Sequence, residues 1–152
     1  MDCTVTWVGA QAASGGLSNM SFLAQTGSGH SIMMDGAVNA EQPAISGANL
    51  AARPMELLLA GAGGCSSFDV VLMLQRGRHA VHGCTVKITA DRAESPPQVF
   101  TKIQMHFTVT GKNLPTAAVE RAIAMSHEKY CSATIMLGKT AAISTSFEIQ
   151  EV

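Results

Sequence analysis

Residues 54–75 read PMELLLAGAGGCSSFDVVLMLQ, and this stretch decides the fold. Pro54 suits a helix start, because its missing N–H costs nothing there, while Arg76 and Gly77 suit a helix end. The sequence predicts a long helix over 54–76 that is apolar on nearly every side. Such a helix is buried rather than half exposed, so we expect a sheet on one side of it and a partner subunit's helix on another.

Three glycines interrupt this helix at Gly61, Gly63 and Gly64. Each is less favourable than Ala in a helix by about 1 kcal/mol. Their concentration within four positions therefore needs a reason. Close approach of another backbone is one, and a local distortion around Cys65 is another.

The rest of the chain contains segments with the hydrophobic period of strands and segments with the period of helices. In chain order we expect a strand over 3–9, a hairpin over 19–34, an aperiodic loop over 36–53, the helix, strands over 82–92 and 99–110, a helix over 115–130, a short helix from Cys131 and a strand over 141–150. Adjacent hairpins favour an antiparallel sheet with segregated helices, a two-layer α+β fold. The length of 152 residues predicts one domain over 1–152.

Composition limits the partners. The net charge is -1, and no Lys/Arg cluster stands out, so nucleic acid and anionic membrane are not expected. The sequence contains no run of 18 uninterrupted apolar residues, so no membrane span is predicted. No secretory signal is evident, so we expect a cytoplasmic protein. Charged residues make up only 14% of the chain, which favours an oligomer interface that covers apolar surface.

The four cysteines are Cys3, Cys65, Cys84 and Cys131. They form no CxxC pair or zinc-finger spacing, so no metal or cofactor is expected. In a reducing compartment a disulfide among them is more often transient and catalytic than structural. Free cysteine is usually a small buried hydrophobe. Cys3, near the start of the chain, and Cys84, on an alternating strand, fit that interpretation.

Cys131 begins a short helix, and a helix N-terminus stabilises an anion, which favours a thiolate. From this position alone, a reactive role and a structural role of Cys131 are equally well supported. Cys65 lies in mid-helix with Asp69 four residues on, on the same face, where a carboxylate disfavours the thiolate. Activation of Cys65 must therefore come from beyond its own helix. His127 is interpreted as a solvated surface residue rather than a base.

Residues 54–65 (PMELLLAGAGGC) resemble the pattern of the OsmC/Ohr family, which is Pro, any residue, Glu-Leu, a small or apolar run and a cysteine in a long central helix. A second cysteine that starts a short helix in the last third, here Cys131, completes the resemblance, and the details look most like the YhfA-like branch. The resemblance implies a peroxidase for organic or inorganic hydroperoxides in oxidative-stress defence. Cys65 would become a sulfenic acid and then form a disulfide with Cys131.

The resemblance also implies an intertwined homodimer, no bound cofactor and an external dithiol or lipoyl-type reductant. The family uses a Glu and an Arg to activate the first thiol, and Glu56 matches the Glu. Glu56 and Cys65 are nine residues apart, ~13.5 Å of helix rise and about half a turn. They cannot meet within one chain, whereas an antiparallel partner helix would join them. The family places its Arg at the end of the strand before the long loop, and this chain has no Arg there. Arg53 is the nearest substitute, and we expect its side chain to reach Glu56.

A second class of function stays open, a non-catalytic protein of the same fold that binds an apolar ligand in the interface pocket. Its support is the methionine content, which suits a flexible apolar pocket; the methionines concerned are Met33, Met34, Met55, Met73 and Met105. An ordinary or raised pKa of Cys65, together with absence of peroxide turnover, would favour this class, whereas full peroxidase activity of a Cys65→Ser variant would exclude the role of Cys65 in the first. A hydrolase is disfavoured because no nucleophile-elbow frame surrounds Cys65.

Overall fold

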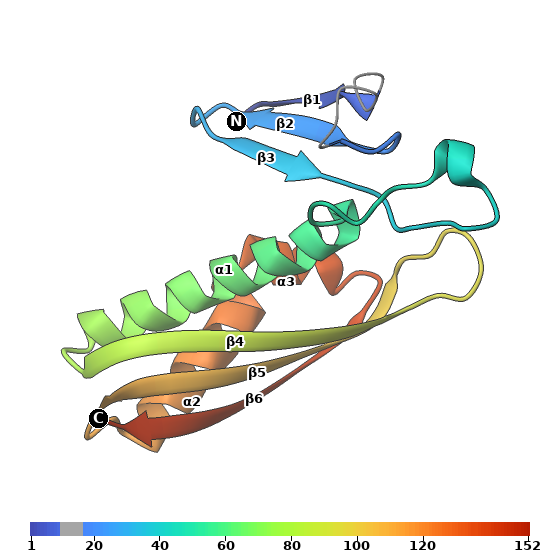
Figure 1. Ribbon diagram of the computed structural model, residues 1–152. Coiled ribbons are helices and arrows are strands. Elements are labelled where there is room, and N and C mark those ends of the chain that lie inside the picture. Colours follow the sequence, from blue (N-terminus) through green and yellow to red (C-terminus); the bar gives the residue numbers. More distant parts are fainter. Residues whose placement is uncertain (10–16) are drawn as a thin grey trace. The chain divides into compact units, whose positions relative to one another are not determined.

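The structure is a computed structural model that describes residues 1–9 and 17–152. The chain forms two compact units, Met1–Leu58 and Leu59–Val152. The expectation of one domain over 1–152 stays a prediction beside this division. In chain order the elements are β1 (Cys3–Trp7), β2 (Phe22–Thr26), β3 (Ser31–Met34), the 3₁₀ turn η2 (Pro43–Ile45), α1 (Pro54–Arg76), β4 (Ala80–Arg92), β5 (Phe100–Lys112), α2 (Thr116–Met125), the π-helical turn η3 (Ser126–Tyr130), α3 (Ser132–Leu137) and β6 (Ala142–Glu151) (Figure 1).

The first unit contains an antiparallel sheet in the order β1-β2-β3. The expected hairpin is present as β2 and β3, and Gly29 adopts a φ of 84° in its turn. This left-handed conformation is one that glycine tolerates without steric cost. The expected strand over 3–9 is also present, over Cys3–Trp7.

The long loop after β3 is organised around the buried carboxylate of Asp35. The backbone N–H groups of Ala48 and Leu50 donate to its Oδ2 at 3.1 and 2.9 Å, and Gly36 N–H and Ser18 Oγ donate to Oδ1. Desolvation by burial raises the pKa of Asp35, but these four hydrogen bonds outweigh it and hold the pKa below its ordinary value. An ionised carboxylate therefore fixes a segment that lacks periodic structure.

The second unit contains a sheet in the order β4-β5-β6. β4 and β5 pair antiparallel, as the expected hairpin requires, but β5 and β6 pair parallel, with Phe107 opposite Phe147. The expectation of a wholly antiparallel sheet is therefore wrong for this pair. The reason is the connection through α2, η3 and α3, because a helical crossover returns the chain in the same direction along the sheet.

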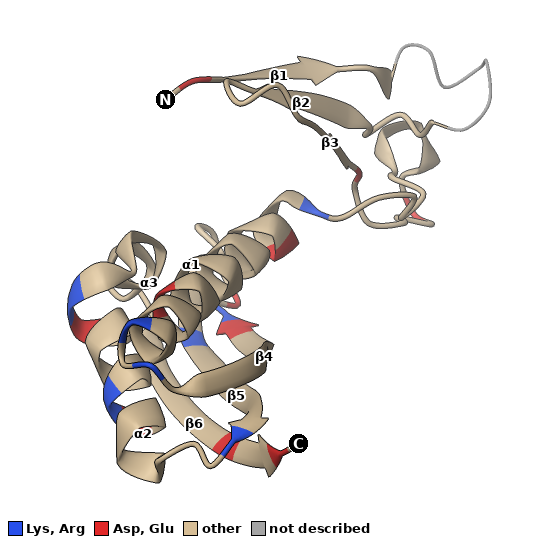
Figure 2. Ribbon diagram, turned by 90° about the vertical axis from the view of Figure 1, so that its left-hand side faces the viewer, with Lys and Arg blue, Asp and Glu red and all other residues tan. Residues whose placement is uncertain are grey.

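The core of this unit lies between the sheet and the helices, which gather on one face of it (Figure 2). β5 alternates, and four inward side chains are at most 1% exposed: Ile103, Met105, Phe107 and Val109. From α2 the buried residues are Val119, Ala122 and Ile123. These three positions are the apolar face that a period of 3.6 residues indicates in this segment.

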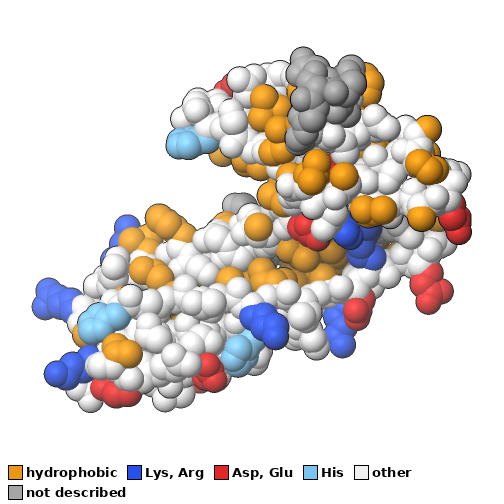
Figure 3. Space-filling model, viewed as in Figure 1, with side chains coloured by type: hydrophobic (Ala, Val, Ile, Leu, Met, Phe, Trp, Pro, Cys, Tyr) orange, Lys and Arg blue, Asp and Glu red, His pale blue; other side chains and the backbone are white. Residues whose placement is uncertain are grey.

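α1 begins and ends where the sequence indicates, but the chain buries only one stripe of it. Its buried residues are Ala62, Gly63, Ser66, Val70 and Leu74. Phe68, on another side, is 68% exposed, and apolar side chains reach the surface at several places on the face in view in Figure 3. Burial on every side is thus not achieved within this chain.

The α1 glycines differ in their surroundings. A Cβ on Gly63 would lie 2.8 Å from Ile88 Cδ1 and 3.1 Å from Val86 Cγ1, so this glycine permits close packing on β4. A Cβ on Gly61 or Gly64 would meet nothing within 4 Å. Length and composition alone would let α1 cross a membrane, yet its Gly63 side packs on the sheet as a core helix does.

Candidate active site

Two cysteines and one carboxylate meet in the second unit. The Sγ atoms of Cys65 and Cys131 and a carboxylate oxygen of Asp69 all lie within 4.8 Å of one another. α1 supplies Cys65 and Asp69, whose spacing of four places them on one helix face. Cys131 is fully buried, and the other two are half-buried. The fold therefore joins the two cysteines that the sequence singled out and adds Asp69 to them.

The position of Cys131 follows from a change of helix type. α2 ends at Met125, the π-helical turn η3 follows, and Cys131 then takes an extended conformation with φ -73° and ψ 96° as the N-cap of α3. Its Sγ accepts a hydrogen bond from Thr134 N–H at 3.4 Å and lies 3.9 Å from the carbonyl oxygen of Ala62 in α1. Backbone groups from two helices thus fix this sulfur.

A pair of buried serines supports the carboxylate. Ser126 Oγ donates to Asp69 Oδ2 at 2.9 Å and lies 3.0 Å from Ser66 Oγ. Because the single Ser126 proton goes to the carboxylate, Ser66 must donate to Ser126. Sequence reasoning missed this relay, although Ser126 is a polar residue on the apolar face of its helix, and that was the available signal.

The electrostatics of this cluster disfavour the Cys65 thiolate. Desolvation by burial is the largest influence that raises the pKa of Cys65 above its ordinary value. A hydrogen bond and charge interaction with Cys131 and the charge of Asp69 raise it further, and only the backbone N–H of Ala133 lowers it. None of these groups is a cation. Within one chain the thiol is therefore protonated at neutral pH.

The other two cysteines lie outside the cluster. Cys84 is half-buried in β4, and burial raises the pKa of its thiol, partly offset by a hydrogen bond from Ser67. This environment agrees with the packing interpretation. Cys3 is exposed in β1, so the expectation of a buried residue is wrong there; strand β1 shows no buried position in the described chain.

Glu56 and Arg53 lie in the first unit, at the start of α1. Glu56 Oε2 accepts a hydrogen bond from the backbone N–H of Arg53 at 2.9 Å, as in a helix cap. The Arg53 guanidinium instead donates through Nη2 to Asn49 Oδ1 at 3.1 Å. Only the Arg53 backbone contacts Glu56, so the expected approach of the Arg53 side chain to Glu56 is not present among the described contacts. The thiol-activating roles of both residues stay predictions.

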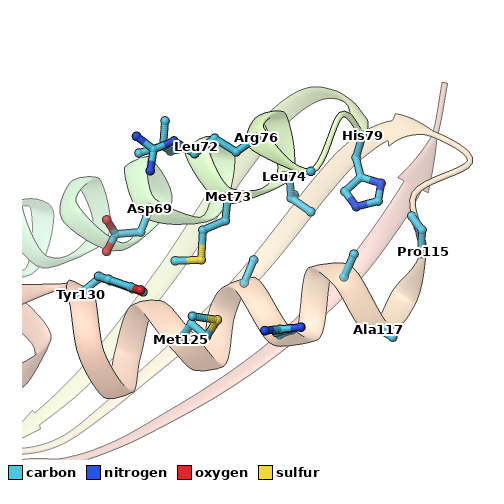
Figure 4. A pocket seen from close by; sticks show the side chains of 14 residues that line it. Asp69, Leu72, Met73, Leu74, Arg76, His79, Pro115, Ala117, Met125 and Tyr130 are labelled. Carbon is cyan, nitrogen blue, oxygen red and sulfur yellow. The ribbon is translucent and has the colours of Figure 1, made fainter.

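A groove of about 740 Å³ runs between α1 and α2 in the second unit (Figure 4). Its lining is largely apolar, with Leu72, Met73 and Met125, and it includes the guanidinium side chains of Arg76 and Arg121. Asp69 also lines this groove. The groove and the thiol cluster therefore share one carboxylate.

His127 in η3 is half-buried, and its Nδ1 is buried without a hydrogen-bond partner among the described residues. It is therefore not the solvated surface residue that was expected. Its ring belongs neither to the thiol cluster nor to the groove lining.

Comparison with known proteins agrees with this architecture. Residues 47–146 match the family model described as OsmC-like protein. Protein YhfA of Escherichia coli (strain K12) is 45% identical over 149 residues, covering 98% of each chain. A crystal structure of a protein from Aquifex aeolicus VF5 superposes with a TM-score of 0.79 at 24% identity, covering 99% of this chain and 96% of that one.

A third relative carries a functional name. The organic hydroperoxide resistance protein OsmC of Legionella pneumophila superposes with a TM-score of 0.63 at 13% identity, covering 97% of each chain. At this identity the likeness extends to the fold alone. From the family match and the full-length identity to YhfA, the chain belongs to the OsmC-like protein family.

Proposed function

We propose that the protein is a thiol-dependent hydroperoxide reductase with Cys65 as the peroxide-reactive residue and Cys131 as the resolving residue. The observation that carries the proposal is the approach of the two Sγ atoms to within 4.8 Å, from residues 66 positions apart in the sequence. A member of the same fold bears the name of an organic hydroperoxide resistance protein, which supports this class of substrate.

The reaction balances as follows. The Cys65 thiolate attacks one peroxide oxygen, the O–O bond breaks, and Cys65 becomes a sulfenic acid while the alkoxide leaves and takes the proton that the thiol had released to solvent, which gives the alcohol. The Cys131 thiol then displaces water from this sulfur, and the disulfide forms. An external dithiol, of the lipoyl type, exchanges with the disulfide and returns both thiols while becoming oxidised itself.

The surroundings of Cys131 suit the second step. An S–S bond is about 2.05 Å long, so the two sulfurs must approach each other. Cys131 lies between two short helical segments rather than inside a regular helix. Rotation about its extended backbone would bring its sulfur toward Cys65 with α1 left in place.

Organic hydroperoxides fit the site better than hydrogen peroxide. The groove that shares Asp69 with the cluster has room and apolar lining for a hydrocarbon chain. Arg76 and Arg121 in its lining would interact favourably with an anionic group on such a substrate.

A homodimer is the proposed source of thiol activation. Gly61, Gly64 and Phe68 recur at intervals of three and four on α1, and this stripe is open or exposed in the single chain. Small residues on such a stripe let a second helix approach closely. An antiparallel α1 of the partner would carry its Glu56 and Arg53 to Cys65, where a cation would favour the thiolate.

The oligomer has a direct test. Wild-type protein should sediment as a dimer, and Phe68→Asp should shift it toward monomer and lower peroxide turnover together. The control is Thr145→Asp, which adds the same charge at an exposed position of β6. A Phe68→Asp dimer of wild-type stability would contradict the interface.

The catalytic test follows consumption of tert-butyl hydroperoxide with dihydrolipoamide, together with intact mass after one turnover without reductant. We expect rapid peroxide loss and a mass lower by two hydrogens in wild type and in the control Cys84→Ser. Cys65→Ser should lose turnover, and Cys131→Ser should accumulate oxidised forms of Cys65. Undiminished turnover in Cys65→Ser would refute the proposal.

A second candidate rests on the same groove. An apolar volume of about 740 Å³ with two Arg in its lining also fits an acyl ligand with an anionic head. For this function the thiols would be structural. Absence of peroxide turnover, combined with saturable binding of a fluorescent fatty acid that Met73→Arg abolishes, would favour it over the reductase.

A further inference from the structure

The thiol cluster has the composition of a metal site that the sequence spacing did not reveal. Cys65, Cys131 and Asp69 offer two sulfurs and an oxygen, all within 4.8 Å of one another. Zn–S bonds of about 2.3 Å in a tetrahedron place two sulfurs roughly 3.8 Å apart. The three atoms therefore need to converge by about 1 Å or less to share one ion.

We propose that Cys65, Cys131 and Asp69 bind one soft divalent cation, with Zn²⁺ as the natural representative. Thiolates select soft and borderline ions over Mg²⁺ and Ca²⁺. Three protein ligands leave a fourth tetrahedral position to water. Cys65 and Asp69 are half-buried, so the ion can enter from solvent, whereas Cys131 closes the site from the interior.

The neighbouring hydrogen bonds are those that support a ligand set. Ser126 donates a hydrogen bond to Asp69 Oδ2, so Oδ1 stays available to an ion. Ser66 in turn hydrogen-bonds to Ser126 and orients it. Thr134 N–H donates to Cys131 Sγ and orients it. Outer hydrogen bonds of this kind orient metal ligands and contribute to metal affinity.

Charge favours the same assignment. In their ionised forms the three groups would place three negative charges within 4.8 Å, an arrangement that is unfavourable without a cation. On binding, each thiol releases its proton to solvent, and two thiolates, one carboxylate and one divalent cation together carry a single negative charge.

A cation bound to Cys65, Cys131 and Asp69 would block peroxide reduction reversibly. This consequence rests on the proposed reductase function. A sulfur bound to Zn²⁺ shares the electron pair that would attack the peroxide, and the bound pair cannot form a disulfide. Conversely, the Cys65–Cys131 disulfide offers no thiolate to the ion. Metal and peroxide thus compete for the same two sulfurs.

The binding test uses the full-length, reduced, chelator-treated protein titrated anaerobically with Cd²⁺, whose thiolate charge-transfer absorption reports sulfur ligation. We expect saturation at one equivalent and displacement by Zn²⁺ in wild type and in Cys84→Ser. Cys65→Ser and Cys131→Ser should lose most of the absorption. Asp69→Asn and Ser126→Ala, which keep both thiols, should weaken binding by about tenfold or more.

Absence of a saturable band in wild type, or equal affinity in wild type, Asp69→Asn and Ser126→Ala, would overturn the assignment. Loss of the Cd²⁺ absorption in Cys84→Ser, with the absorption kept in Cys65→Ser and Cys131→Ser, would also overturn the assignment. Peroxide turnover measured with chelator separates the two proposals. Peroxide turnover without metal binding would contradict the metal site and support the reductase. Metal binding without turnover in the metal-free protein would leave the site and remove the reductase.

Discussion

Ser126 Oγ donates to Asp69 Oδ2 at 2.9 Å and thereby ties the π-helical turn η3 to the central helix α1 beside the thiol pair. Ser126→Ala removes this donor and leaves Ser66 without its acceptor in a buried site. We expect the free energy of unfolding to fall by about 1–3 kcal/mol, measured by urea denaturation. Because both serines belong to one relay, Ser66→Ala/Ser126→Ala should cost less than the sum of the single changes; strict additivity would contradict the relay.

Asp69→Asn should make Cys65 more reactive. The Asp69 charge contributes to the raised pKa of the Cys65 thiol, so its removal lowers that pKa and enlarges the thiolate fraction at neutral pH. The measurement is the alkylation rate of Cys65 by iodoacetamide as a function of pH, followed by peptide mass. The pH–rate curve should move to lower pH, while the exposed Asp91→Asn leaves it in place. An unchanged curve in Asp69→Asn would show that its charge is screened.

Asp35 predicts an acid-sensitive loop in the first unit. Its pKa is lowered in the folded protein, so its contribution to stability is complete above the ordinary value of 3.8 and disappears as pH falls through the lowered folded pKa. Asp35→Asn should remove that contribution at neutral pH, by about 1–3 kcal/mol for the lost charged acceptor. Hydrogen exchange of the Ala48 and Leu50 amides should accelerate. The control Glu41→Gln changes an exposed carboxylate, and protection equal to wild type in Asp35→Asn would contradict the prediction.

The contact of Gly63 with β4 predicts coupling between two positions. Gly63→Ala gains up to about 1 kcal/mol of helix propensity, but its Cβ would displace Ile88 Cδ1. Ile88→Val removes that methyl group and alone costs about 0.5–1.5 kcal/mol. The double variant should be more stable than the sum of the two changes by about 0.5 kcal/mol or more. Gly64→Ala with Ile88→Val is the matched control, because Gly64 has open space, and it should be additive.

Much of the fold was predictable because local chemistry sets it. The bounds of α1 follow from Pro54 and the terminal Arg76 and Gly77, and the buried face of α2 follows from its period. The parallel pairing of β6 was missed, although the helices expected between strands 99–110 and 141–150 were the signal for it, because a helical crossover returns the chain in the same direction.

The candidate site was predictable in part. The family pattern pointed to Cys65 and Cys131, and helix spacing added Asp69. The contribution of Ser126 depends on tertiary packing, since its helix period alone would place a small apolar residue there. The irregular turn before Cys131, which sets the direction of its sulfur, likewise has no local signature in the sequence.

The parallel pairing of β6 has a consequence for how the molecule folds. The β4–β5 hairpin can form from neighbouring contacts, whereas β6 can dock on β5 only after residues 113–141 have folded into the crossover. Cys131 lies within that crossover, and its contact with Cys65, 66 positions away, is non-local like the pairing of β5 with β6. A partly folded chain therefore carries two separate, ordinary thiols. Assembly of the reactive pair reports that the second unit has reached its native topology.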